Sequence, residues 1–571
     1  MVQTGADPGA GPVELRVLTG PNLYFPRPAV KLTLDATGVL GADPAQVVAW
    51  QRALRVREPT VGLPHSPART VAAAELAAAV VRRAAGRLGT RVAAVGRPGD
   101  DDTIVVAYPF RHRATAELFG DSVARAFAGI TRHGTDPEVA LDRIPDELAG
   151  HDPGETIAPL RPSIPVIAVT GTNGKTTTTR LIAHLVRTGG RTPGWSSTDG
   201  IFIDGVEVES GDWSGPGGAG RVLADPSVQV AVTETARGGI LLRGVGTAVN
   251  DVSVVTNISA DHLGLLGVHT LEQLAEVKSV IVRITRPSGW TVLNADDPLV
   301  RAMRSVSRAK PWFFSPDPDN PYLADALEAG GRAITVIDGR IVILGRGHDP
   351  TDVLGLGEVP VTMAGASAVN TANALAATAA AVAVGVPLDA VRQGLRTFTT
   401  GAEHNAGRLN VYAVDGTTVV LDLAHNEASL ASLLSVAGAL RLPGGDLAVV
   451  LGTAGDRPDE AIHAMGAMAA RAADRLVVAR RTKYTRGRPT GEMEAIWRAG
   501  AAEAGVVDVG ESADEFSGLT RLLDAGLPTG SVVAVCALEQ RTQMVGEIAR
   551  RGGGEMSARE VAERVRDAGA G

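Results

Sequence analysis

The residue pattern with the most specific chemistry is the stretch VTGTNGKTTTT, which spans residues 169–179. A short apolar run, PVIAVT, leads into Gly171 and Gly174, and a helix-like segment then starts with Lys175 and Thr176. Glycines let backbone N–H groups approach phosphate oxygens, and a helix start carries partial positive charge. The lysine would reach the phosphates and the threonine hydroxyl can hold Mg²⁺. The order of these residues therefore predicts a phosphate-binding loop.

The same stretch also has a plainer interpretation. It is a shortened G-x-x-G-K-T form, because Val169 stands where the eight-residue phosphate loop has glycine. In a chain with 68 glycines, a turn with this glycine spacing also arises by chance. However, only five of the 55 basic residues are lysines, and one of them stands here. Phosphate binding is therefore the favoured interpretation.

Polar residues that suit a metal ion follow two further strand-like runs. Glu234 ends the run VQVAVTE, and Asp261 and His262 follow the run VSVVTNI. Open α/β sheets place their ligands at the carboxyl ends of their strands. Single polar residues at strand ends commonly cap a helix or a turn instead, so the group indicates a site more strongly than any one member does.

Lys278 lies on the apolar face of a predicted helix, LEQLAEVKSVIVRI, whose start carries the capping-box pair Thr270 and Gln273. A buried ammonium is costly unless it is paired, and burial lowers the pKa of a lysine. The neutral amine could then react with CO₂ to give a carbamate, which resembles a carboxylate as a metal ligand. The alternative, which helical spacing alone favours, is a lysine at the edge of the stripe that extends its ammonium into solvent.

Strand-like and helix-like segments alternate along the chain and predict an α/β protein with doubly wound parallel sheets. A first α/β unit precedes a proline-rich stretch, strand–turn–helix alternation begins at PVIAVT, and it restarts at TVVLDLAH. The expected divisions are a flexible tail (1–12), an α/β N-terminal domain (13–150), a linker (151–163), a phosphate-loop central domain (164–400), a Rossmann-like C-terminal domain (401–551) and a C-terminal tail (552–571).

Composition excludes several classes of function. The net charge of −8 argues against a nucleic-acid groove or an anionic membrane surface as the main partner. No apolar run approaches the length of a membrane-spanning helix, and no leader-like segment opens the sequence, so we expect a cytoplasmic location. A single cysteine, Cys536, leaves no internal disulfide to form.

The motifs occur in the order found in Mur-type amide ligases, the superfamily that includes the peptidoglycan Mur ligases and folylpolyglutamate synthetase. They are VTGTNGKTTTT, TETARGG, TNISADHLGL, VLNADDP, NTANALAA, GRLN, DLAHN and GDRPDE. STDGIFIDG, GDWSGP, ETARGGIL and RGRPTGE more specifically resemble the Mur-like part of cyanophycin synthetases, and LTGPNLYFPRPAVKLTLD resembles their N-terminal domain. The resemblance covers about residues 14–550 and leaves no room for the ATP-grasp domain that those enzymes carry between these parts. Val369 is a smaller departure, since many Mur ligases have histidine there.

The resemblance implies that ATP and Mg²⁺ bind at the phosphate loop. The phosphates would be held by Gly171, Thr172, Asn173, Gly174, Lys175, Thr176 and Thr177. Thr176 and Glu234 would bind one Mg²⁺, and His262 and carbamylated Lys278 would bind a second. Lys175, His262 and Lys278 would thus be the catalytic residues.

The remaining implied contacts come from the rest of the central domain and from the C-terminal domain. Asn294 would contact adenine, and Arg408 and Asp422 would contact the nucleotide. The incoming substrate would lie near His425 and near the loop 483–492, which contains Arg486, Arg488 and Glu492. A charged loop of that kind is as readily a solvated surface.

The implied reaction is ATP-dependent joining of a carboxylate to an amine through an acyl phosphate, and transfer of arginine to an aspartyl side chain is the family-implied example. The substrates would be small molecules or peptides, and neither a nucleic acid nor a membrane is expected as a partner. Without an ATP-grasp half, the protein could also work beside a separate ATP-grasp ligase, and a homo-oligomer is compatible with the resemblance. The alternatives are a nucleotide-binding regulatory relative without ligase activity and another phosphate-loop ATPase or kinase.

Overall fold

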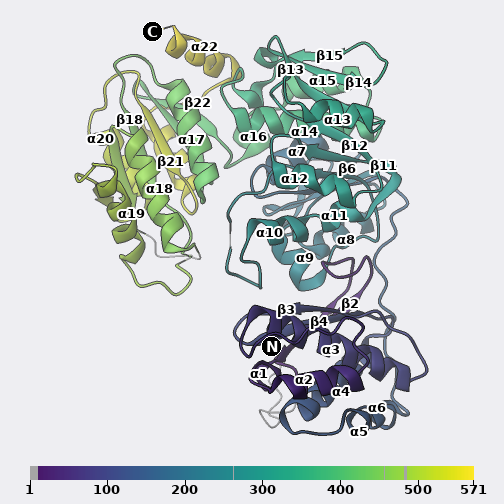
Figure 1. Cartoon of the computed structure of the whole chain (residues 1–571). Coiled ribbons are helices and arrows are strands. Elements are labelled where there is room, and N and C mark those ends of the chain that lie inside the picture. The colour runs from purple at the N-terminus through teal and green to yellow at the C-terminus, as the bar shows by residue number, and fades with distance from the viewer. Residues whose placement is uncertain (1–10, 262, 456, 481–484, 571) are drawn as a thin grey trace. The chain divides into compact units, whose positions relative to one another are not determined.

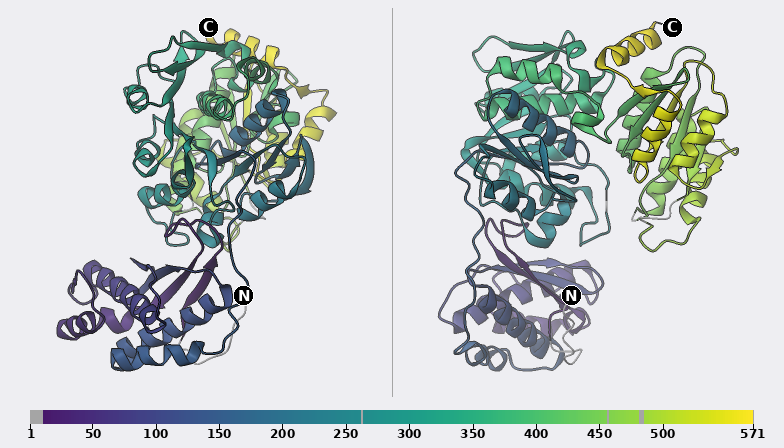
Figure 2. Two further views of the ribbon diagram at one scale, coloured as in Figure 1. Left: turned by 90° about the vertical axis from the view of Figure 1, so that its right-hand side faces the viewer. Right: turned by 180° about the vertical axis from the view of Figure 1, so that it is seen from behind.

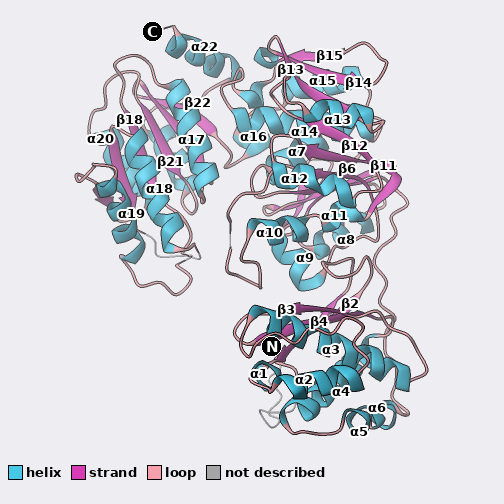
Figure 3. Cartoon of the chain, in the orientation of Figure 1, coloured by secondary structure: helices cyan, strands magenta, loops and turns pink. Residues whose placement is uncertain are grey.

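The structure, a computed structural model, describes residues 11–570 except 262, 456 and 481–484. It is an α/β protein with three sheets, and its chain divides into two compact units. The first unit comprises the residues up to Ser163 together with Ser214–Gly220 and Thr235–Val249, and the second comprises the remainder. Figure 1 labels the elements, Figure 2 shows them from two further sides, and Figure 3 distinguishes helices from strands. In the part of the chain described, no helix is long and apolar enough to cross a membrane.

The first unit is built on a four-stranded antiparallel sheet of order β1-β2-β4-β3. The alanine-rich helix α3 packs against β3 and β4, because its small side chains allow close approach. The later segment α9 (Arg237–Arg243) also belongs to this unit, and Thr19 donates its backbone N–H to the Arg243 carbonyl at 2.8 Å. The strands and the other helices are β1 (Glu14–Leu18), β2 (Ala29–Asp35), β3 (Val95–Pro98), β4 (Thr103–Pro109), α1 (Thr37–Leu40), α2 (Pro44–Ala53), α3 (Pro67–Arg87), α4 (Arg113–Arg132), α5 (Pro137–Asp142) and α6 (Ile144–Leu148).

The second unit begins with an eleven-stranded sheet of order β15-β14-β13-β12-β11-β10-β5-β9-β6-β7-β8. Its central strands are parallel, and antiparallel hairpins close both edges. The strands are β5 (Val166–Thr170), β6 (Pro193–Ser196), β7 (Gly200–Ile203), β8 (Val206–Ser210), β9 (Val230–Glu234), β10 (Asn250–Val255), β11 (Thr285–Asn294), β12 (Lys310–Phe314), β13 (Arg332–Ile337), β14 (Arg340–Gly345) and β15 (Thr351–Gly355).

Apolar side chains of α7, α14 and α15 form one core with one face of this sheet, and α8 packs on the other face. The helices are α7 (Lys175–Thr188), α8 (Pro216–Ala224), α10 (Leu271–Lys278), α11 (Val280–Arg283), α12 (Pro298–Ala302), α13 (Tyr322–Glu328), α14 (Ala368–Ala383), α15 (Leu388–Thr397) and α16 (Ala402–Asn405), with short 3₁₀ turns at Met303–Val306, Leu356–Glu358 and Pro360–Thr362. Burial on both faces explains why its central strands read as continuous apolar runs.

The C-terminal sheet has the order β20-β19-β18-β21-β17-β16-β22. Helices α17, α18, α19 and α22 pack on one face and α20 and α21 on the other, so this sheet is doubly wound as predicted. In the segment expected as a C-terminal tail, β22 pairs with β16 and α22 packs against α17. The elements are β16 (Asn410–Val414), β17 (Thr417–Asp422), β18 (Leu447–Leu451), β19 (Arg475–Ala479), β20 (Gly510–Ser512), β21 (Val532–Cys536), β22 (Gly554–Glu555), α17 (Glu427–Leu440), α18 (Asp459–Ala472), α19 (Glu492–Glu503), α20 (Glu515–Asp524), α21 (Arg541–Arg550) and α22 (Ala558–Gly569).

Candidate functional site

The predicted phosphate loop connects the buried strand β5 to helix α7, and its two glycines are required by its backbone. Gly171 has a φ of +149°, and a Cβ there would lie 1.9 Å from the Thr256 hydroxyl. Gly174, directly before α7, has a φ of +84°, and a Cβ there would lie 2.3 Å from the Asn373 side-chain oxygen. Other residues cannot adopt this conformation without strain, so these glycines are not a chance turn.

The loop is held in place by residues that follow the neighbouring strand β10. Asn173 donates its backbone N–H to the Asn257 side chain at 2.9 Å and accepts the Thr256 hydroxyl at 2.6 Å. The Thr172 hydroxyl exchanges hydrogen bonds with the backbone of Ser259. These contacts fix the loop backbone before any ligand binds, which reduces the entropy lost on binding.

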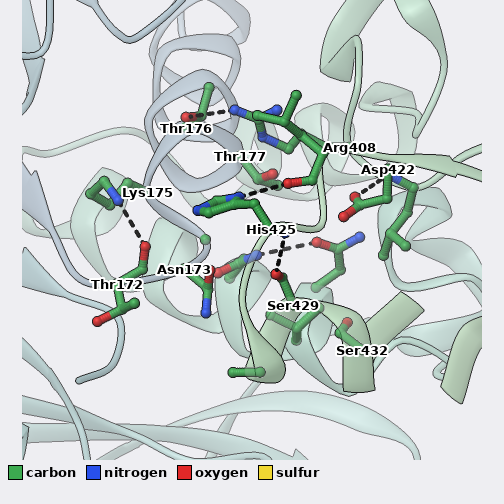
Figure 4. A pocket seen from close by; sticks show the side chains of 17 residues that line it. Thr172, Asn173, Lys175, Thr176, Thr177, Arg408, Asp422, His425, Ser429 and Ser432 are labelled. Carbon is green, nitrogen blue, oxygen red and sulfur yellow. Dashed lines mark hydrogen bonds between the residues drawn. The ribbon is translucent and has the colours of Figure 1, made fainter. Parts of the chain in front are cut away.

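The first turn of α7 places a cation and a hydroxyl beside a buried carboxylate. Lys175 donates to the Thr172 carbonyl at 2.8 Å, as Figure 4 shows, and Thr176 donates to Glu234 Oε2 at 2.9 Å. Glu234 ends β9 and is 1% exposed. Burial raises the pKa of Glu234, whereas the positive charge of Lys175 and the Thr176 hydrogen bond oppose that rise.

Glu234 and Thr176 together fit a divalent cation. Within the described part of the chain, Glu234 Oε1 is buried and accepts no hydrogen bond. A buried carboxylate oxygen without a partner is costly, and Mg²⁺ prefers oxygen ligands of this kind. His262, a predicted ligand of the second Mg²⁺, lies outside the described residues.

Lys278 is buried, and this overturns the alternative in which its ammonium extends into solvent. The residue ends α10 and is 4% exposed, and Nζ donates to the Gly171 carbonyl at 2.7 Å. The predicted capping box of Thr270 and Gln273 starts that helix. The amine therefore lies directly against the phosphate loop.

Residues that flank the C-terminal strands β16 and β17, with others from α17, complete a cavity of about 110 Å³ over the phosphate loop (Figure 4). Arg408 donates from Nη2 to the Thr176 hydroxyl at 3.3 Å. Asp422, at the end of β17, accepts the Leu409 N–H at 2.8 Å, and burial raises its pKa to about 6 despite the opposing charge of Arg408. His425 also lines the cavity, and burial lowers its pKa. These three predicted residues thus face the same space as Lys175.

Two asparagines of α14 line this cavity although the sequence analysis assigned them no role. Asn373 accepts the Thr178 hydroxyl and donates to Asn370 Oδ1 at 3.1 Å. The side-chain amide nitrogen Nδ2 of Asn370 is buried and has no hydrogen-bond partner within the described chain. Their spacing of three residues in NTANALAA puts both on one helix face, a signal that was available in the sequence.

Two other sets of predicted residues do not reach this cavity. Asn294 donates to the Thr256 carbonyl at 2.8 Å and accepts the Asp296 N–H, so its contact with adenine stays a prediction. Arg488 donates to the carbonyls of Gly455 and Arg457 and pairs with Asp459 and Glu492, which makes it a brace of the loop around residue 457. Arg486 is exposed, and Lys483 lies outside the described residues.

The braced loop carries a contact back to the loop after β10. Arg457, which is 4% exposed, pairs with Asp261 at 3.0 Å and donates to the His425 carbonyl at 3.2 Å. Asp261 was predicted at a strand end as part of a metal group, and the structure gives it an ion pair with Arg457 instead. Arg488 and Glu492 therefore act on His425 through Arg457 rather than by facing the cavity.

Comparisons with known proteins agree with this architecture. Residues 169–381 match the Mur ligase middle domain, and residues 407–538 match the domain described as Mur ligase, glutamate ligase domain. The chain is 45% identical over 329 residues to cyanophycin synthetase of Synechocystis sp., a match that covers 58% of this chain and 37% of that protein.

Two solved structures share the fold. They are E. coli FolC in complex with DHPP and ADP (TM-score 0.50, 20% identity, 69% of this chain and 90% of that one) and a bifunctional folylpolyglutamate synthase/dihydrofolate synthase with Mn, AMPPNP and L-glutamate bound (TM-score 0.50, 19% identity, 68% of this chain and 91% of that one). At these identities they establish the fold alone.

The fold and the site define a phosphate-loop α/β protein whose C-terminal sheet contributes to the cavity over that loop. The two matched domains together cover more than half of the chain. The chain belongs to the Mur ligase superfamily. It spans 37% of the length of the Synechocystis cyanophycin synthetase that it matches.

Proposed function

We propose that this protein is an ATP-dependent ligase that joins a carboxylate to an amine. The observation that carries the proposal is the convergence of Lys175, Thr176, Glu234 and Arg408 at one cavity over a braced phosphate loop. A simple nucleotide-binding module needs the loop and the lysine, but it does not need a buried carboxylate held against the loop threonine. Membership of the Mur ligase superfamily supports the same assignment.

The phosphates of ATP would replace the internal contacts that the loop now makes. Lys175 would exchange the Thr172 carbonyl for phosphate oxygens, and the backbone N–H groups of the first turn of α7 would donate to them. Arg408 would add a second cation from the C-terminal sheet. Asn370 would supply the donor that now has no partner in the described chain.

The proposed reaction has two steps. An oxygen of the substrate carboxylate attacks the γ-phosphorus, and ADP leaves as an acyl phosphate forms. The amine nitrogen then attacks the acyl carbon, phosphate leaves, and the nitrogen gives up a proton to form the amide. Lys175 and Arg408 would neutralise charge that builds on the transferring phosphoryl group, and preorganised cations of this kind supply most of the rate enhancement in phosphoryl transfer.

The residues present also fit Mg²⁺, which Thr176 and Glu234 would hold. Bound there, the ion would supply charge stabilisation at the phosphates. His262 and a carbamylated Lys278 are proposed as ligands of a second Mg²⁺. The buried position of the Lys278 amine against Gly171 supports that role, because it keeps the amine away from solvent.

Among carboxylate–amine pairs, we propose arginine and an aspartyl side chain as the first to test. The support is the 45% identity to a cyanophycin synthetase over 329 residues. Small molecules and peptides are the substrate class, and the proposal includes neither nucleic acid nor membrane. A homo-oligomer and a separate ATP-grasp ligase partner remain compatible with it, as does a cytoplasmic location.

The proposal is tested by incubating the purified protein with ATP, Mg²⁺ and pairs of carboxylates and amines, beginning with aspartyl peptides and arginine. We expect ADP release that needs both substrates, and an amide product in the mass spectrum. Release of ADP without any amide would indicate an ATPase or a kinase. Nucleotide binding without turnover for any pair would indicate a regulatory relative.

Replacement of Lys278 by alanine should lower ligase activity at least about 10-fold, because it removes the amine that would carry the carbamate. Formate or acetate should restore part of that activity by supplying the missing carboxylate. Carbon-13 NMR of the wild-type protein in labelled bicarbonate should show a carbamate carbon that the Lys278→Ala protein lacks. Full activity of Lys278→Ala, or no such resonance in the wild type, would contradict the carbamate.

Asp422 should make the protein less stable as pH rises through its titration range. Its folded pKa of about 6 lies above the ordinary value of 3.8, so the folded state holds the proton more tightly than the unfolded state. Stability from this group is therefore full below about pH 4 and is lost as pH rises through about 6, a total loss of about 3 kcal/mol at about 1.4 kcal/mol per pKa unit.

The check is the Tm of the wild type and of Asp422→Asn, in which the amide oxygen can still accept the Leu409 N–H. The Tm advantage of the variant should grow between pH 5 and pH 7 and then level off. A constant difference across this range would show that Asp422 has no raised pKa.

A further inference from the structure

A second cavity lies beside helix α7, away from its first turn, and we call it the α7 cavity. It has a volume of about 490 Å³, which is in the range of small-molecule sites and larger than the space over the phosphate loop. Its walls come from the α7 residues Arg180, His184 and Arg187, from the β6–β7 hairpin, from α16 and from the start of α21. All of these residues belong to the second compact unit.

The arginines of the α7 cavity carry more positive charge than the carboxylate of Asp199 can balance. Arg180 pairs with Asp199 at 2.9 Å and is also held by the Ala406 carbonyl. Arg541, at the start of α21, is half-buried and has no hydrogen bond or ion pair with any residue that the structure describes. Burial lowers the pKa of Arg180, and the nearby charges of Arg408 and Arg541 lower it further. A half-buried guanidinium without a protein partner is free to form charge-assisted hydrogen bonds to an anionic group.

Gly407 lies directly against the Arg541 side chain. A Cβ at Gly407, whose φ is +75°, would lie 2.3 Å from Arg541 Nη1. The same segment carries Arg408, which donates to Thr176 at the phosphate loop. Arg541 and the phosphate loop are therefore connected through two adjacent residues.

Two further carboxylates line the same cavity. Glu207 and Glu403 line it, are exposed, and have no ion pair within the described chain. A phosphate or another pure anion would be repelled by these carboxylates, and a pure cation would be repelled by the arginines. A ligand that carries both charges satisfies both sets of groups.

The apolar wall limits the ligand to one with some hydrocarbon between its charges. Trp195 and Phe202 stack with their rings 4.8 Å apart and an interplanar angle of 6°, and Phe398 packs edge-on against His184. His184 is neutral at physiological pH, because burial lowers its pKa to about 4. These rings add an uncharged surface to the cavity that the arginines and the glutamates also line.

The segment that carries Asp199 also contacts the proposed metal site. Asp199 follows Thr198, whose hydroxyl is 3.5 Å from the Thr176 hydroxyl, and Thr176 bonds Glu234. Asp199 in the cavity wall is therefore next in sequence to a residue that contacts the Thr176–Glu234 pair.

We propose that the α7 cavity binds a zwitterion, either a free amino acid or the charged end of a peptide, with its carboxylate on Arg541 and its cationic group toward Glu207 and Glu403. The inference deepens the proposed ligase function, since this ligand would be one of the two substrates. Arg541 is the specificity-determining residue of the cavity.

The test is calorimetric titration of the full-length protein with L-aspartate, L-arginine and the dipeptide aspartyl-arginine, without nucleotide. We expect at least one of them to bind, and Arg541→Gln to weaken that binding about 10- to 100-fold, the range for a charge-assisted contact. Arg541→Lys should retain part of the affinity. Arg550→Gln, at the exposed end of the same helix and paired with Glu547, is the matched control and should bind as the wild type does. Binding of L-aspartate or L-arginine would identify a free amino acid as the ligand, whereas binding of the dipeptide alone would identify the charged end of a peptide.

The idea is overturned if no probe binds, or if Arg541→Gln binds as tightly as the wild type while its circular dichroism and Tm are unchanged. The ligase assignment is judged separately with Lys175→Ala, which should bind the probes normally and release no ADP. If the wild-type protein binds a probe but forms no amide, the proposed ligand site stands and the proposed ligase function is wrong. If Arg541→Gln is an active ligase with unchanged KM values for the carboxylate and the amine, the ligase function stands and the proposed ligand site is wrong.

Discussion

Replacement of Lys175 by alanine should abolish substrate-dependent ADP release, with a loss of at least about 100-fold in kcat. The side chain is the cation at the start of α7, and its ammonium already contacts the phosphate-loop backbone at 2.8 Å. Its compact charge would move to the phosphates of ATP, and no neighbouring residue can take its place there, because Arg408 is already engaged with Thr176. The measurement is coupled ADP release at saturating carboxylate and amine.

Lys310→Ala is the matched control for this change, because Lys310 is an exposed lysine at the start of β12. It should leave ADP release unchanged. The Lys175→Ala protein should also keep the wild-type Tm within a few degrees, since Lys175 is only half-buried and makes one hydrogen bond. If Lys175→Ala still releases ADP at the wild-type rate, the phosphate-loop assignment is wrong.

Replacement of Glu234 by glutamine should have opposite effects on activity and stability. The substitution keeps the shape and a hydrogen-bond acceptor for Thr176 but removes the charge that would hold Mg²⁺. We expect activity at limiting Mg²⁺ to fall at least about 100-fold, because a metal ligand is lost. In the presence of EDTA the variant should melt above the wild type, because burial raises the pKa of Glu234 and the ionised carboxylate destabilises the folded protein.

The opposite signs separate a functional carboxylate from a structural one. A carboxylate kept for stability would lower the Tm when neutralised, whereas a ligand site commonly costs the fold stability. Glu272→Gln, in the first turn of α10, is the control: it should leave activity unchanged and should lower rather than raise the Tm, because hydrogen bonds at the helix start lower the pKa of Glu272. Full activity of Glu234→Gln at limiting Mg²⁺ would exclude Glu234 as a metal ligand.

Local motifs in the sequence were sufficient to locate the phosphate loop and the ends of the strands beside it. Gly171, Gly174 and Lys175 lie within five residues of each other, so their roles follow from backbone conformation and helix-start chemistry. Glu234 was found because an apolar strand of the parallel sheet ends on it. The α/β fold class followed from alternation of strand and helix patterns, whose periods are local properties.

Contacts between distant segments were not accessible in the same way. The Arg457–Asp261 pair joins residues 196 positions apart, and nothing in either motif specifies the partner of the other. The family resemblance placed Arg488 and Glu492 near a substrate, and nothing in their loop indicated that Arg488 would bond the Arg457 carbonyl and pair with Glu492. The segment expected as a C-terminal tail likewise carries no local sign of its partner, and β22 pairs with β16.

Lys278 shows which property of a residue depends on local sequence and which depends on tertiary packing. The sequence by itself determined that this residue has a helical position on the apolar face, because a period of 3.6 residues is a property of the chain alone. Whether its amine reaches solvent or the phosphate loop was decided only by the tertiary structure, which places the Gly171 carbonyl within 2.7 Å of Nζ. The same holds for Arg541, which has no ion pair with any residue that the structure describes and lines a cavity made by helices and strands that are far apart in sequence. Local spacing fixes the conformation of a segment, whereas the partners of its side chains depend on which elements pack together.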